Sequence, residues 1–545
     1  MYSDHKSVNL LTAMLLAYGV EDAVVCPGAR NAPISHNLHA LGARLRLHPV
    51  TDERSAAFVA LGIALRTGRP TALCVTSGSA LLGTLPAVAE ARMRHIPLLV
   101  ISADRPARLV GQLEGQTLPQ VGALQPYAQT FQLPERAEEE EDTWHLQHLL
   151  HRAFRELLRP GGGPCHVNVP IPEPLFGFSQ TELPAVAAMH FAHKRAERPL
   201  TEDVMKLIAG AETPILLMGQ RDAIPTDAVR DIEARGQMLV LPEVIAGAAG
   251  SWRTLLLEEA PLPAGDYVVV HVGGNLVGKK LKQNLQGRDD VRVVRIEEGD
   301  DMPDTFRHLH AVVHGDADAA LRQLAETLPE NARVRSLQHT LAEQWRESRE
   351  LEAGLSLREK AFALLAQTIS ETHGVAALHL ANSTPVRLAR RYFDGGGELR
   401  ILCNRGTNGI EGSASTAVGY AIADAALCRA RGEKPKVTLL VTGDLSFFYD
   451  VNALWNTQLG GNLRILLLND GGGSIFRTLP GLGESSACRQ VVAAAHNATA
   501  EGVCRSFGAA YLRAETEAEL AAHITTLLTA ECGQPMVVEA VLQDQ

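Results

Sequence analysis

The stretch VTLLVTGDLSFFYDVNALWNTQLGGNLRILLLNDGGG, residues 437–473, predicts the fold of its part of the chain. It contains two short runs of Val, Ile and Leu, at 437–441 and 465–468, and each run ends in small and acidic residues. Continuous apolar strands, rather than alternating ones, are typical of a parallel sheet that helices cover on both faces. Ligands of such sheets bind beyond the carboxyl ends of the strands. We therefore expect Asp444 and Asp470 to lie together at one edge of a parallel sheet.

The same pattern recurs along the chain. Further apolar runs, each followed by a turn marked by Gly or Pro and by a helical pattern, lie at Ala23–Cys26, Ala72–Thr76, Leu98–Ser102, Cys165–Val169, Ile215–Met218, Met238–Leu241, Tyr267–Val272, Val291–Ile296, Leu378–Leu380, Ile401–Cys403 and Met536–Ala540. About a dozen strands are too many for one sheet, so the fold class predicted is α/β with three doubly wound domains and mostly parallel sheets. A stretch rich in Pro and Gly at 161–200 and a charged helical stretch at 317–360 divide the chain into segments 1–183, 195–335 and 355–545.

The composition excludes several classes of protein. The chain has 545 residues, with 51 Lys and Arg against 62 Asp and Glu, which gives a net charge of −11. A nucleic-acid-binding surface needs massed basic residues, and none are massed here. No apolar run approaches the roughly 18 residues that span a bilayer. The eight cysteines form no C-x-x-C pair, which indicates reduced thiols in a cytoplasmic protein.

The two motifs within 437–473 together predict a metal and diphosphate site. The carboxylates of Asp444 and Asp470 and the backbone carbonyl of Gly472 are hard oxygen ligands, which suit Mg²⁺ or Mn²⁺ when phosphate oxygens complete the coordination shell. The glycines after each strand let backbone N–H groups approach phosphate. Either motif alone is more often a tight turn with a helix cap, but their combination at this spacing favours the site.

This pair of motifs resembles the signature of thiamine diphosphate enzymes, in which Gly-Asp is followed by Asn-Asn or a close variant. The resemblance implies a glutamate after an early strand, and Glu53 in the sequence Thr-Asp-Glu-Arg at 51–54 matches it. In that family the glutamate hydrogen-bonds N1′ of the aminopyrimidine ring and thereby activates the cofactor. Without the resemblance, Asp-Glu-Arg is typical of a solvated helix start.

Longer blocks resemble one branch of these enzymes, the SEPHCHC synthases of menaquinone biosynthesis. The blocks are PGARN (27–31), TDERSAAFVALGIAL (51–65), VTSGSALLGTLPAVAEA (75–91), SADRP (102–106), GKK (278–280), NSTPVR (382–387), NRGTNGIEG (404–412), GDLSFFYDVNALW (443–455) and NDGGGSIF (469–476). They span the first and last segments nearly end to end, whereas the middle segment matches only around GKK.

The resemblance implies an enzyme, a C–C bond-forming transferase. It would decarboxylate 2-oxoglutarate and add the succinyl semialdehyde carbanion to isochorismate by 1,4-addition, with thiamine diphosphate and Mg²⁺ or Mn²⁺ as cofactors. Segment 1–183 would be the pyrimidine-binding domain, 195–335 the central domain and 355–545 the diphosphate- and metal-binding domain. The subunits would form a homodimer or homotetramer, with each active site between the first segment of one subunit and the last of another.

Individual residues take roles from the same resemblance. The positions that match catalytic or substrate-facing residues are Glu53, Arg30, Arg105, Gln116, Lys279, Ser383, Arg387 and Arg405. The positions that match cofactor-binding residues are Glu53, Ile410, Gly443, Asp444, Leu445, Ser446, Asp470, Ile475 and Phe476. Arginine suits dicarboxylate substrates because its planar group pairs with a carboxylate through two hydrogen bonds. A lone arginine is more often part of a structural salt bridge, Ser383 fits a helix cap equally well, and the three apolar residues also fit core packing.

Three residues depart from the family pattern. Ala29 replaces a common Ser, and Gly115 replaces an Asn that often precedes the glutamine matched by Gln116. Both changes remove a polar group near the substrate and affect the expected specificity. Asp470 replaces a common metal-binding Asn, which adds a negative charge beside the metal.

Two other motifs predict no site. The sequence 273–279 fits the phosphate-binding pattern G-x-x-x-x-G-K, but Lys280 occupies the position of the required Ser or Thr. His145, His148 and His151 follow the acidic run 138–142 and fan over about 120° of a helix, which is typical of a solvated helix rather than a metal site.

Two alternative functions remain open from the sequence. One is another thiamine diphosphate enzyme, such as an acetolactate-synthase-like ligase or a 2-oxo acid decarboxylase. The other is a non-catalytic protein that keeps the fold. The arginines at strand ends favour dicarboxylate substrates over the first, and the retention of Glu53, Asp444 and Asp470 argues against the second.

Overall fold

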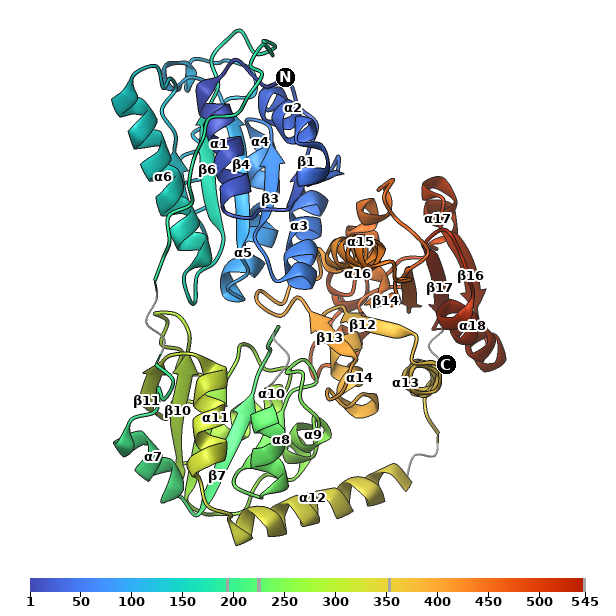
Figure 1. The fold of residues 1–545 in the computed structure, drawn as a ribbon. Helices are drawn as coiled ribbons and strands as arrows, with labels where there is room; N and C mark the ends of the chain where they lie inside the picture. Colours follow the sequence, from blue (N-terminus) through green and yellow to red (C-terminus); the bar gives the residue numbers. More distant parts are fainter. Residues whose placement is uncertain (193–195, 223–226, 351–353, 543–545) are drawn as a thin grey trace.

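The chain folds into three α/β units, each built on its own parallel sheet (Figure 1). The structure is a computed structural model that describes residues 1–192, 196–222, 227–350 and 354–542. Every ladder between its named strands is parallel. The predicted three-domain α/β class is therefore confirmed. The predicted domain limits at 195 and 545 lie outside the described residues.

The first unit contains a sheet of strand order β2-β1-β3-β4-β6-β5. Its strands are β1 (Asp22–Val25), β2 (Arg46–Pro49), β3 (Thr71–Val75), β4 (Leu98–Asp104), β5 (Gln129–Gln132) and β6 (Cys165–Pro170). Its helices are α1 (Lys6–Ala17), α2 (Ala32–Ala40), α3 (Glu53–Thr67), α4 (Ser79–Gly83), α5 (Leu85–Met93) and α6 (Glu140–Leu158). The central strands are buried at every position, as continuous apolar runs covered on both faces should be.

The central unit has a five-stranded sheet of order β11-β10-β9-β7-β8. Its strands are β7 (Thr213–Met218), β8 (Leu239–Pro242), β9 (Tyr267–Val272), β10 (Val291–Glu297) and β11 (Leu309–His314). Its helices are α7 (Glu202–Ala209), α8 (Asp227–Ala234), α9 (Trp252–Glu259), α10 (Lys279–Gln286), α11 (Ala317–Thr327) and α12 (Ala332–Glu350). The long helix α12 extends from this unit toward the third one (Figure 1).

The third unit has the order β13-β12-β14-β15-β17-β16, which repeats the topology of the first sheet strand for strand. Its strands are β12 (Val375–Leu380), β13 (Arg400–Cys403), β14 (Val437–Gly443), β15 (Leu463–Asn469), β16 (Ala510–Ala514) and β17 (Met536–Val541). Its helices are α13 (Leu357–Thr372), α14 (Thr384–Tyr392), α15 (Ser413–Arg431), α16 (Asp444–Tyr449), α17 (Glu501–Phe507) and α18 (Glu517–Thr529). Short 3₁₀ turns of the first unit are η1 (Gly42–Arg44) and η2 (Ala107–Leu109). Short 3₁₀ and π turns of the third unit are η3 (Val451–Leu454), η4 (Ser474–Thr478) and η5 (Cys488–Val492).

The strands that the apolar runs did not predict lie at sheet edges. β5, β11 and β16 each have a neighbour on one side only, and their side chains are mostly half-buried or exposed. These three strands cover little of the core, so their sequences carry no continuous apolar run, whereas the edge strands β8 and β13 are largely buried and apolar. Between residue 317 and β12, the elements among the described residues are the helices α11 to α13, as predicted.

The first and third units share one hydrophobic core. A single cluster of buried side chains joins residues of α3 and β3 to residues of α15, β14 and β15. The central unit has two clusters of its own, and its buried residues Val244, Ile245 and Val277 join a further cluster of the third unit. Within the described residues, no helix is long and apolar enough to cross a membrane.

Candidate active site

The carboxyl ends of β14 and β15 bring Asp444 and Asp470 together, as the strand pattern predicts. These strands are adjacent and parallel, with Gly443 paired to Leu468, so the residues that follow them meet at one edge of the sheet. Asp444 is buried at the first turn of α16. Its Oδ2 atom accepts a hydrogen bond of 2.8 Å from the Gly472 N–H and lies 3.3 Å from Nε2 of His496.

The environment of Asp470 fits a cation. Burial raises the pKa of its carboxyl, and the charge of Asp444 raises this pKa further, although Ser474 and Arg358 act in the opposite direction. Its Oδ2 atom accepts hydrogen bonds of 2.6 Å from both Arg358 and Ser474. Its Oδ1 atom is buried and has no hydrogen-bond partner among the described residues. Two neighbouring carboxylates with a free buried oxygen are the donor set that Mg²⁺ or Mn²⁺ satisfies.

The other predicted cofactor residues surround these carboxylates. Gly472 has a φ of +139°, and a Cβ there would lie 2.5 Å from the Ala493 carbonyl oxygen, so this turn needs glycine. Gly443 is the N-cap residue of α16, and the Leu445 N–H bonds to Oδ1 of Asp444. The remaining residues are Ser446 in α16 and the half-buried Ile475 and Phe476 in η4.

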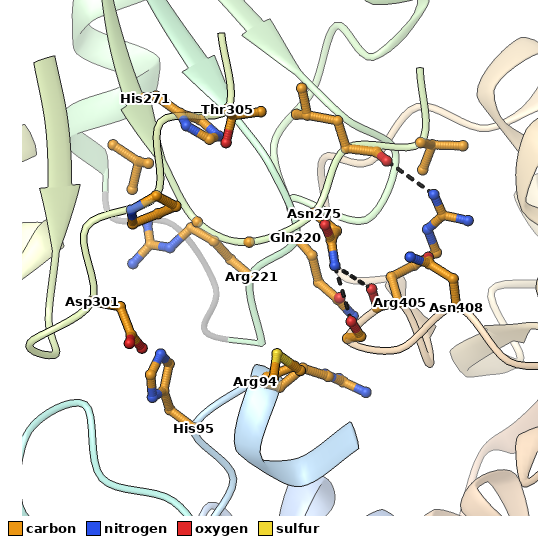
Figure 2. Close-up of a pocket in the computed structure, with 18 of the residues that line it drawn as sticks. Arg94, His95, Gln220, Arg221, His271, Asn275, Asp301, Thr305, Arg405 and Asn408 are labelled. Atoms are coloured by element: carbon orange, nitrogen blue, oxygen red, sulfur yellow. Dashed lines mark hydrogen bonds between the residues drawn. The ribbon is translucent and has the colours of Figure 1, made fainter. Parts of the chain in front are cut away.

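A cavity of about 1230 Å³ lies where the three units meet (Figure 2). The predicted site residues that line it are Lys279, Ser383, Arg387, Arg405 and Ile410. They come from the start of α10 in the central unit and, in the third unit, from the start of α14 and the loop after β13, so residues far apart in the sequence converge on one space. The apolar Ile410, which is 39 % exposed, lines the same cavity as these cationic residues.

The electrostatics of this cavity favour anions. Desolvation lowers the pKa of Arg387, and the nearby positive charge of Arg405 lowers it further. Two guanidinium groups held close together repel each other, and an anion between them relieves that repulsion. Arg405 is fixed by hydrogen bonds of 2.9 Å to the Leu276 carbonyl and 3.4 Å to Oδ1 of Asn382.

Ser383 does not cap its helix. It occupies the N-cap position of α14, but its side chain makes no capping hydrogen bond. Its φ is +71°, a conformation that is uncommon for a residue other than glycine and that recurs at functional sites. Ser383 thus lies in the cavity wall without a capping bond, and its substrate-facing role stays a prediction.

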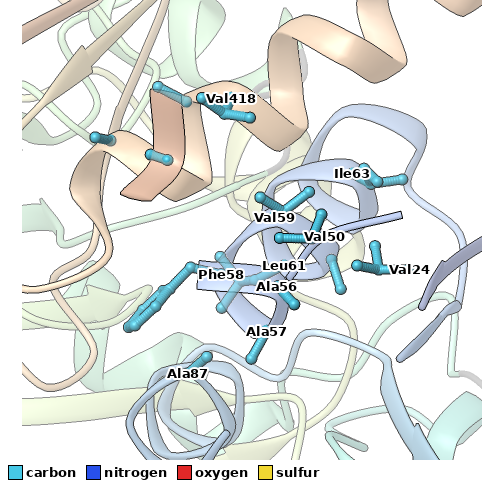
Figure 3. Packing of buried hydrophobic residues seen from close by; sticks show 14 of the residues in the cluster. Val24, Val50, Ala56, Ala57, Phe58, Val59, Leu61, Ile63, Ala87 and Val418 are labelled. Carbon is cyan, nitrogen blue, oxygen red and sulfur yellow. The ribbon is translucent and has the colours of Figure 1, made fainter. Parts of the chain in front are cut away.

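Glu53 lies at the start of α3, which packs against α15 of the third unit (Figure 3). Its neighbour Asp52 caps the helix by accepting the N–H groups of Arg54 and Ser55. Asp52 also accepts a hydrogen bond from Asn452, and Arg54 donates to the Tyr449 carbonyl. The first turn of α3 is thereby attached to the segment that follows Asp444, within one chain.

The other three predicted substrate residues lie elsewhere in the first unit. Arg30 is buried and donates 2.9 Å hydrogen bonds to the Ile171 carbonyl and to Glu173. Arg105 donates to the Gly115 carbonyl, and Gln116 is exposed with a φ of +55°. None of the three lines the cavity formed by the described residues, so their substrate roles stay predictions. Ala29 and Gly115, which depart from the family pattern, are both exposed.

Some residues of this site are absent from the sequence prediction. Gln220 donates to the Cys403 carbonyl, and Asn275 donates to the carbonyls of Arg405 and Gly406. Both follow a strand of the central sheet, so the rule that ligands bind at strand ends could have identified them. Arg94 also lines the cavity, but it ends a helix in the first unit, and no local pattern marks it.

The motifs that predicted no site are structural, as expected. The N–H groups of Val277 and Gly278 are both occupied by Oε1 of the buried Glu243, which leaves no phosphate site before α10. In α6, His151 bonds to the Tyr18 hydroxyl, and His148 stacks on Trp144. Among the described residues, no group of three or more His, Cys, Asp or Glu could hold a metal by itself. A metal at Asp444 and Asp470 would therefore need further oxygen ligands, such as the Gly472 carbonyl, water or a bound molecule.

Comparisons with known proteins place this site in a family. Residues 5–129 match the model of the N-terminal TPP-binding domain of thiamine pyrophosphate enzymes. The chain is 37 % identical to the 2-succinyl-5-enolpyruvyl-6-hydroxy-3-cyclohexene-1-carboxylate (SEPHCHC) synthase of Bacteroides thetaiotaomicron, over 99 % of this chain and 96 % of that protein. The chain belongs to the SEPHCHC synthase family. The synthases of Phocaeicola vulgatus (36 % identical, 99 % of this chain and 96 % of that one) and Desulfotalea psychrophila (33 %, 93 % of each) match similarly.

A solved structure supports the fold. The X-ray structure of a protein from Mycobacterium smegmatis, described as a candidate thiamin diphosphate-dependent enzyme, matches with a TM-score of 0.73 over 99 % of this chain and all of that one. The two sequences are 17 % identical, so this likeness concerns the fold alone. The family resemblance seen in the sequence motifs is confirmed by the relatives that match 99 % of this chain.

Proposed function

We propose that this protein is a SEPHCHC synthase of menaquinone biosynthesis that depends on thiamine diphosphate and on Mg²⁺ or Mn²⁺. It decarboxylates 2-oxoglutarate and joins the remaining four-carbon unit to isochorismate by 1,4-addition. Family membership supports the reaction class. The observation that carries the proposal is the cavity in which Lys279, Arg387 and Arg405 converge beside Ile410, because both substrates are dianions.

The residues at the edge of the third sheet fit the metal and diphosphate. Asp444, Asp470 and the Gly472 carbonyl would hold the cation, whose remaining ligands would be phosphate oxygens. The free buried Oδ1 of Asp470 and the raised pKa of this carboxyl both support a cation there. Gly443, Leu445, Ser446, Ile475 and Phe476 would line the rest of the cofactor site.

Glu53 and Ile410 would position the cofactor's ring system. When bound, thiamine diphosphate would supply a nucleophilic carbon and an electron sink for the decarboxylation. Glu53 would hold a proton at the aminopyrimidine N1′ atom, and Ile410 would support the bent conformation of the cofactor. Ser446 fixes the Ile410 loop by donating a 2.5 Å hydrogen bond to the Ile410 carbonyl.

The cationic residues would bind and orient the substrates. Each guanidinium can pair with a carboxylate through two parallel hydrogen bonds, which sets the orientation as well as the affinity. Arg30, Arg105 and Gln116 would act with Lys279, Ser383, Arg387 and Arg405, although the single chain does not place the first three in the cavity. We propose that a second subunit completes the site, in a homodimer or homotetramer. All eight cysteines are free, which supports a reducing compartment such as the cytoplasm.

Product analysis tests the proposal. The purified protein is incubated with thiamine diphosphate, Mg²⁺, 2-oxoglutarate and isochorismate, and the product is identified by mass spectrometry. We expect the SEPHCHC mass, with CO₂ release from 2-oxoglutarate that exceeds release from pyruvate. A preference for pyruvate would instead identify an acetolactate-synthase-like ligase or decarboxylase.

A further inference from the structure

Glu90 is a buried carboxylate of the first unit that contacts a loop of the third unit. It lies in α5 and is 0 % exposed. The loop, residues 404–410, connects β13 to the turn before α15 and contains Arg405 and Ile410. The two oxygens of Glu90 thus reach the loop between a predicted substrate residue and a predicted cofactor residue.

Three hydrogen bonds from this loop end on Glu90. Its Oε1 atom accepts the Gly406 N–H at 3.0 Å, and its Oε2 atom accepts the Thr407 N–H at 2.7 Å and the Thr407 hydroxyl at 2.9 Å. The approach is close, because a Cβ on Gly406 would lie 2.9 Å from Oε2. Hydrogen bonds from N–H groups to an ionised carboxylate are about twice as strong as neutral ones, so Glu90 restrains this loop tightly.

The charge of Glu90 is balanced by Arg94, which lies where the three units meet. Arg94 lies 3.3 Å from Oε1 of Glu90, is 2 % exposed, and also contacts Asp222 of the central unit. Although desolvation lowers the pKa of Arg94, the charges of Asp222 and Glu90 more than offset this effect and raise it. A buried carboxylate without such a partner would be costly, and Arg94 supplies that partner.

The rest of the loop has separate attachments. Asn382 donates 2.6 Å hydrogen bonds to the carbonyls of Asn404 and Gly409, and Ser446 holds the Ile410 carbonyl. Asn275 holds the carbonyls of Arg405 and Gly406 as well. Glu90 is therefore one of two attachments next to Arg405, whereas Ile410 has separate anchors. Loss of the Glu90 contacts should move Arg405 more than Ile410.

We propose that Glu90 is a positioning residue that holds the 404–410 loop so that Arg405 meets the substrate carboxylate. This inference rests on the proposed function for the identity of the substrate, but not for the attachment of the loop. Displacement of a binding group by about 1 Å can lower a rate by about a hundredfold. The contribution of Glu90 should therefore be seen in substrate kinetics as well as in stability.

The first test compares Glu90→Gln with the wild-type enzyme. The amide has the same shape but no charge, and one of its two atoms can no longer accept an N–H group. We expect hydrogen exchange at the Gly406 and Thr407 amides to become about tenfold faster. We also expect the KM for at least one of the two dicarboxylate substrates to rise about tenfold, with the Kd for thiamine diphosphate and Mg²⁺ within twofold of wild type.

A matched control separates positioning from general stability. Asp424, within α15, is a buried carboxylate that pairs with Arg66 in the last turn of α3, and so also joins the first and third units. Asp424→Asn should lower Tm as Glu90→Gln does, but leave both KM values unchanged. Equal KM changes in the two variants, or unchanged KM values in Glu90→Gln, would overturn the proposal. Thr407→Val, at an exposed position, removes only the hydroxyl donor and should raise the KM by a smaller factor.

A double-mutant cycle tests whether Glu90 acts through Arg405. In the Arg405→Lys background, Glu90→Gln should have little further effect on kcat/KM. If the two substitutions instead lowered kcat/KM by independent factors that multiply, Glu90 would act independently of Arg405, and the proposal would be contradicted. If the wild-type protein forms no SEPHCHC, the proposed function fails, whereas the exchange of the Gly406 and Thr407 amides still tests the attachment.

Discussion

Two acidic residues at the edge of the third sheet occupy different environments. Asp444 receives a backbone N–H and lies beside His496, whereas Asp470 has a buried oxygen without a partner among the described residues. The raised pKa of Asp470 means that its charge is unfavourable in the metal-free protein. A bound cation would remove this cost.

Asp470→Asn should therefore have opposite effects on the metal-free protein and on metal binding. Without metal, the Tm should rise, because burial and the repulsion by Asp444 outweigh the contacts with Ser474 and Arg358. With thiamine diphosphate, the Mg²⁺ concentration for half-maximal activity should rise about tenfold, which corresponds to about 1.4 kcal/mol. Thermal melts and a Mg²⁺ titration check both effects. Asp290→Asn is the control, since Arg288 lowers the pKa of Asp290, and it should leave the Mg²⁺ requirement unchanged.

Glu53→Gln tests the proposed role of the residue at the start of α3. An amide cannot share an ionisable proton with a ring nitrogen, so we expect kcat to fall about a hundredfold or more. The Kd for thiamine diphosphate with Mg²⁺, measured by calorimetry, should change much less. Full turnover in a variant that binds the cofactor would exclude the proposed activation by Glu53.

At the scale of elements, α3 and α15 cross with almost no space between their backbones. A Cβ on Gly62 would lie 2.0 Å from the Thr416 carbonyl oxygen, and one on Gly419 would lie 2.0 Å from the Val59 carbonyl oxygen. Only glycine permits this contact. Since α3 begins with Glu53 and α15 follows the Ile410 loop, the crossing places the predicted ring-binding residues of two units.

Gly62→Ala should separate these helices and destabilise the protein. Overpacking of a well-packed core costs about 1–3 kcal/mol, and this contact involves backbone on both sides, so we expect the upper end. Chemical denaturation measures the loss. Gly502→Ala is the matched control, because a Cβ on this helical glycine would have no other atom within 4 Å, and it should gain about 0.5–1 kcal/mol.

The first turn of α15 depends on Asp450. The two oxygens of this buried carboxylate accept the Ser415 N–H and hydroxyl, each at 2.7 Å. Burial nevertheless raises the pKa of Asp450 from 3.8 to about 6. The folded state thus binds more protons than the unfolded state between these values, so this group makes stability fall as the pH rises from about 4 to about 6.

Asp450→Asn should flatten that part of the pH profile. The amide can still accept the N–H and donate to the Ser415 hydroxyl, and the lost pH dependence should amount to about 3 kcal/mol. Urea denaturation at several pH values provides the measurement. Hydrogen bonds from His48 and Arg46 outweigh the burial of Asp22 and lower its pKa, so Asp22 makes stability rise with pH. Asp22→Asn should therefore remove a contribution of the opposite sign. A profile that Asp450→Asn leaves unchanged would contradict the raised pKa.

At the scale of the whole molecule, one ion cluster joins all three units. Arg94 of the first unit contacts Glu90, Asp222 of the central unit and Asn404 of the third unit. The cavity that holds the cationic site residues lies at this same junction. The relative position of the units therefore decides the geometry of the site.

Arg94→Ala should weaken the connection between the units. It leaves Asp222 and the buried Glu90 without their cation, which costs about 3–5 kcal/mol. We expect calorimetry to show a lower Tm and a separate transition for the central unit. Arg198→Ala, which removes an exposed ion pair with Glu326, should cost about 0–1 kcal/mol. A single unchanged transition in Arg94→Ala would show that other contacts hold the units together.

The sequence by itself determined the α/β class, the central strands and the residues at their carboxyl ends. These follow from local rules, because a strand buried on both faces must be apolar and the residues after it must lie at the ligand-binding edge. Asp444, Asp470 and Arg405 could be identified in this way, and the family resemblance added Glu53 and Ile410.

Only the tertiary structure decided how the units combine. Glu90 and Arg94 lie within and at the end of a helix, and their partners in the other two units come from positions more than a hundred residues away. No local pattern encodes such contacts. The edge strands β5, β11 and β16 and the shared topology of the first and third sheets were hidden for a related reason. The sequences of these strands reflect partial burial and contacts with distant neighbours. Apolar runs and turns indicate only how deeply their own segment is buried.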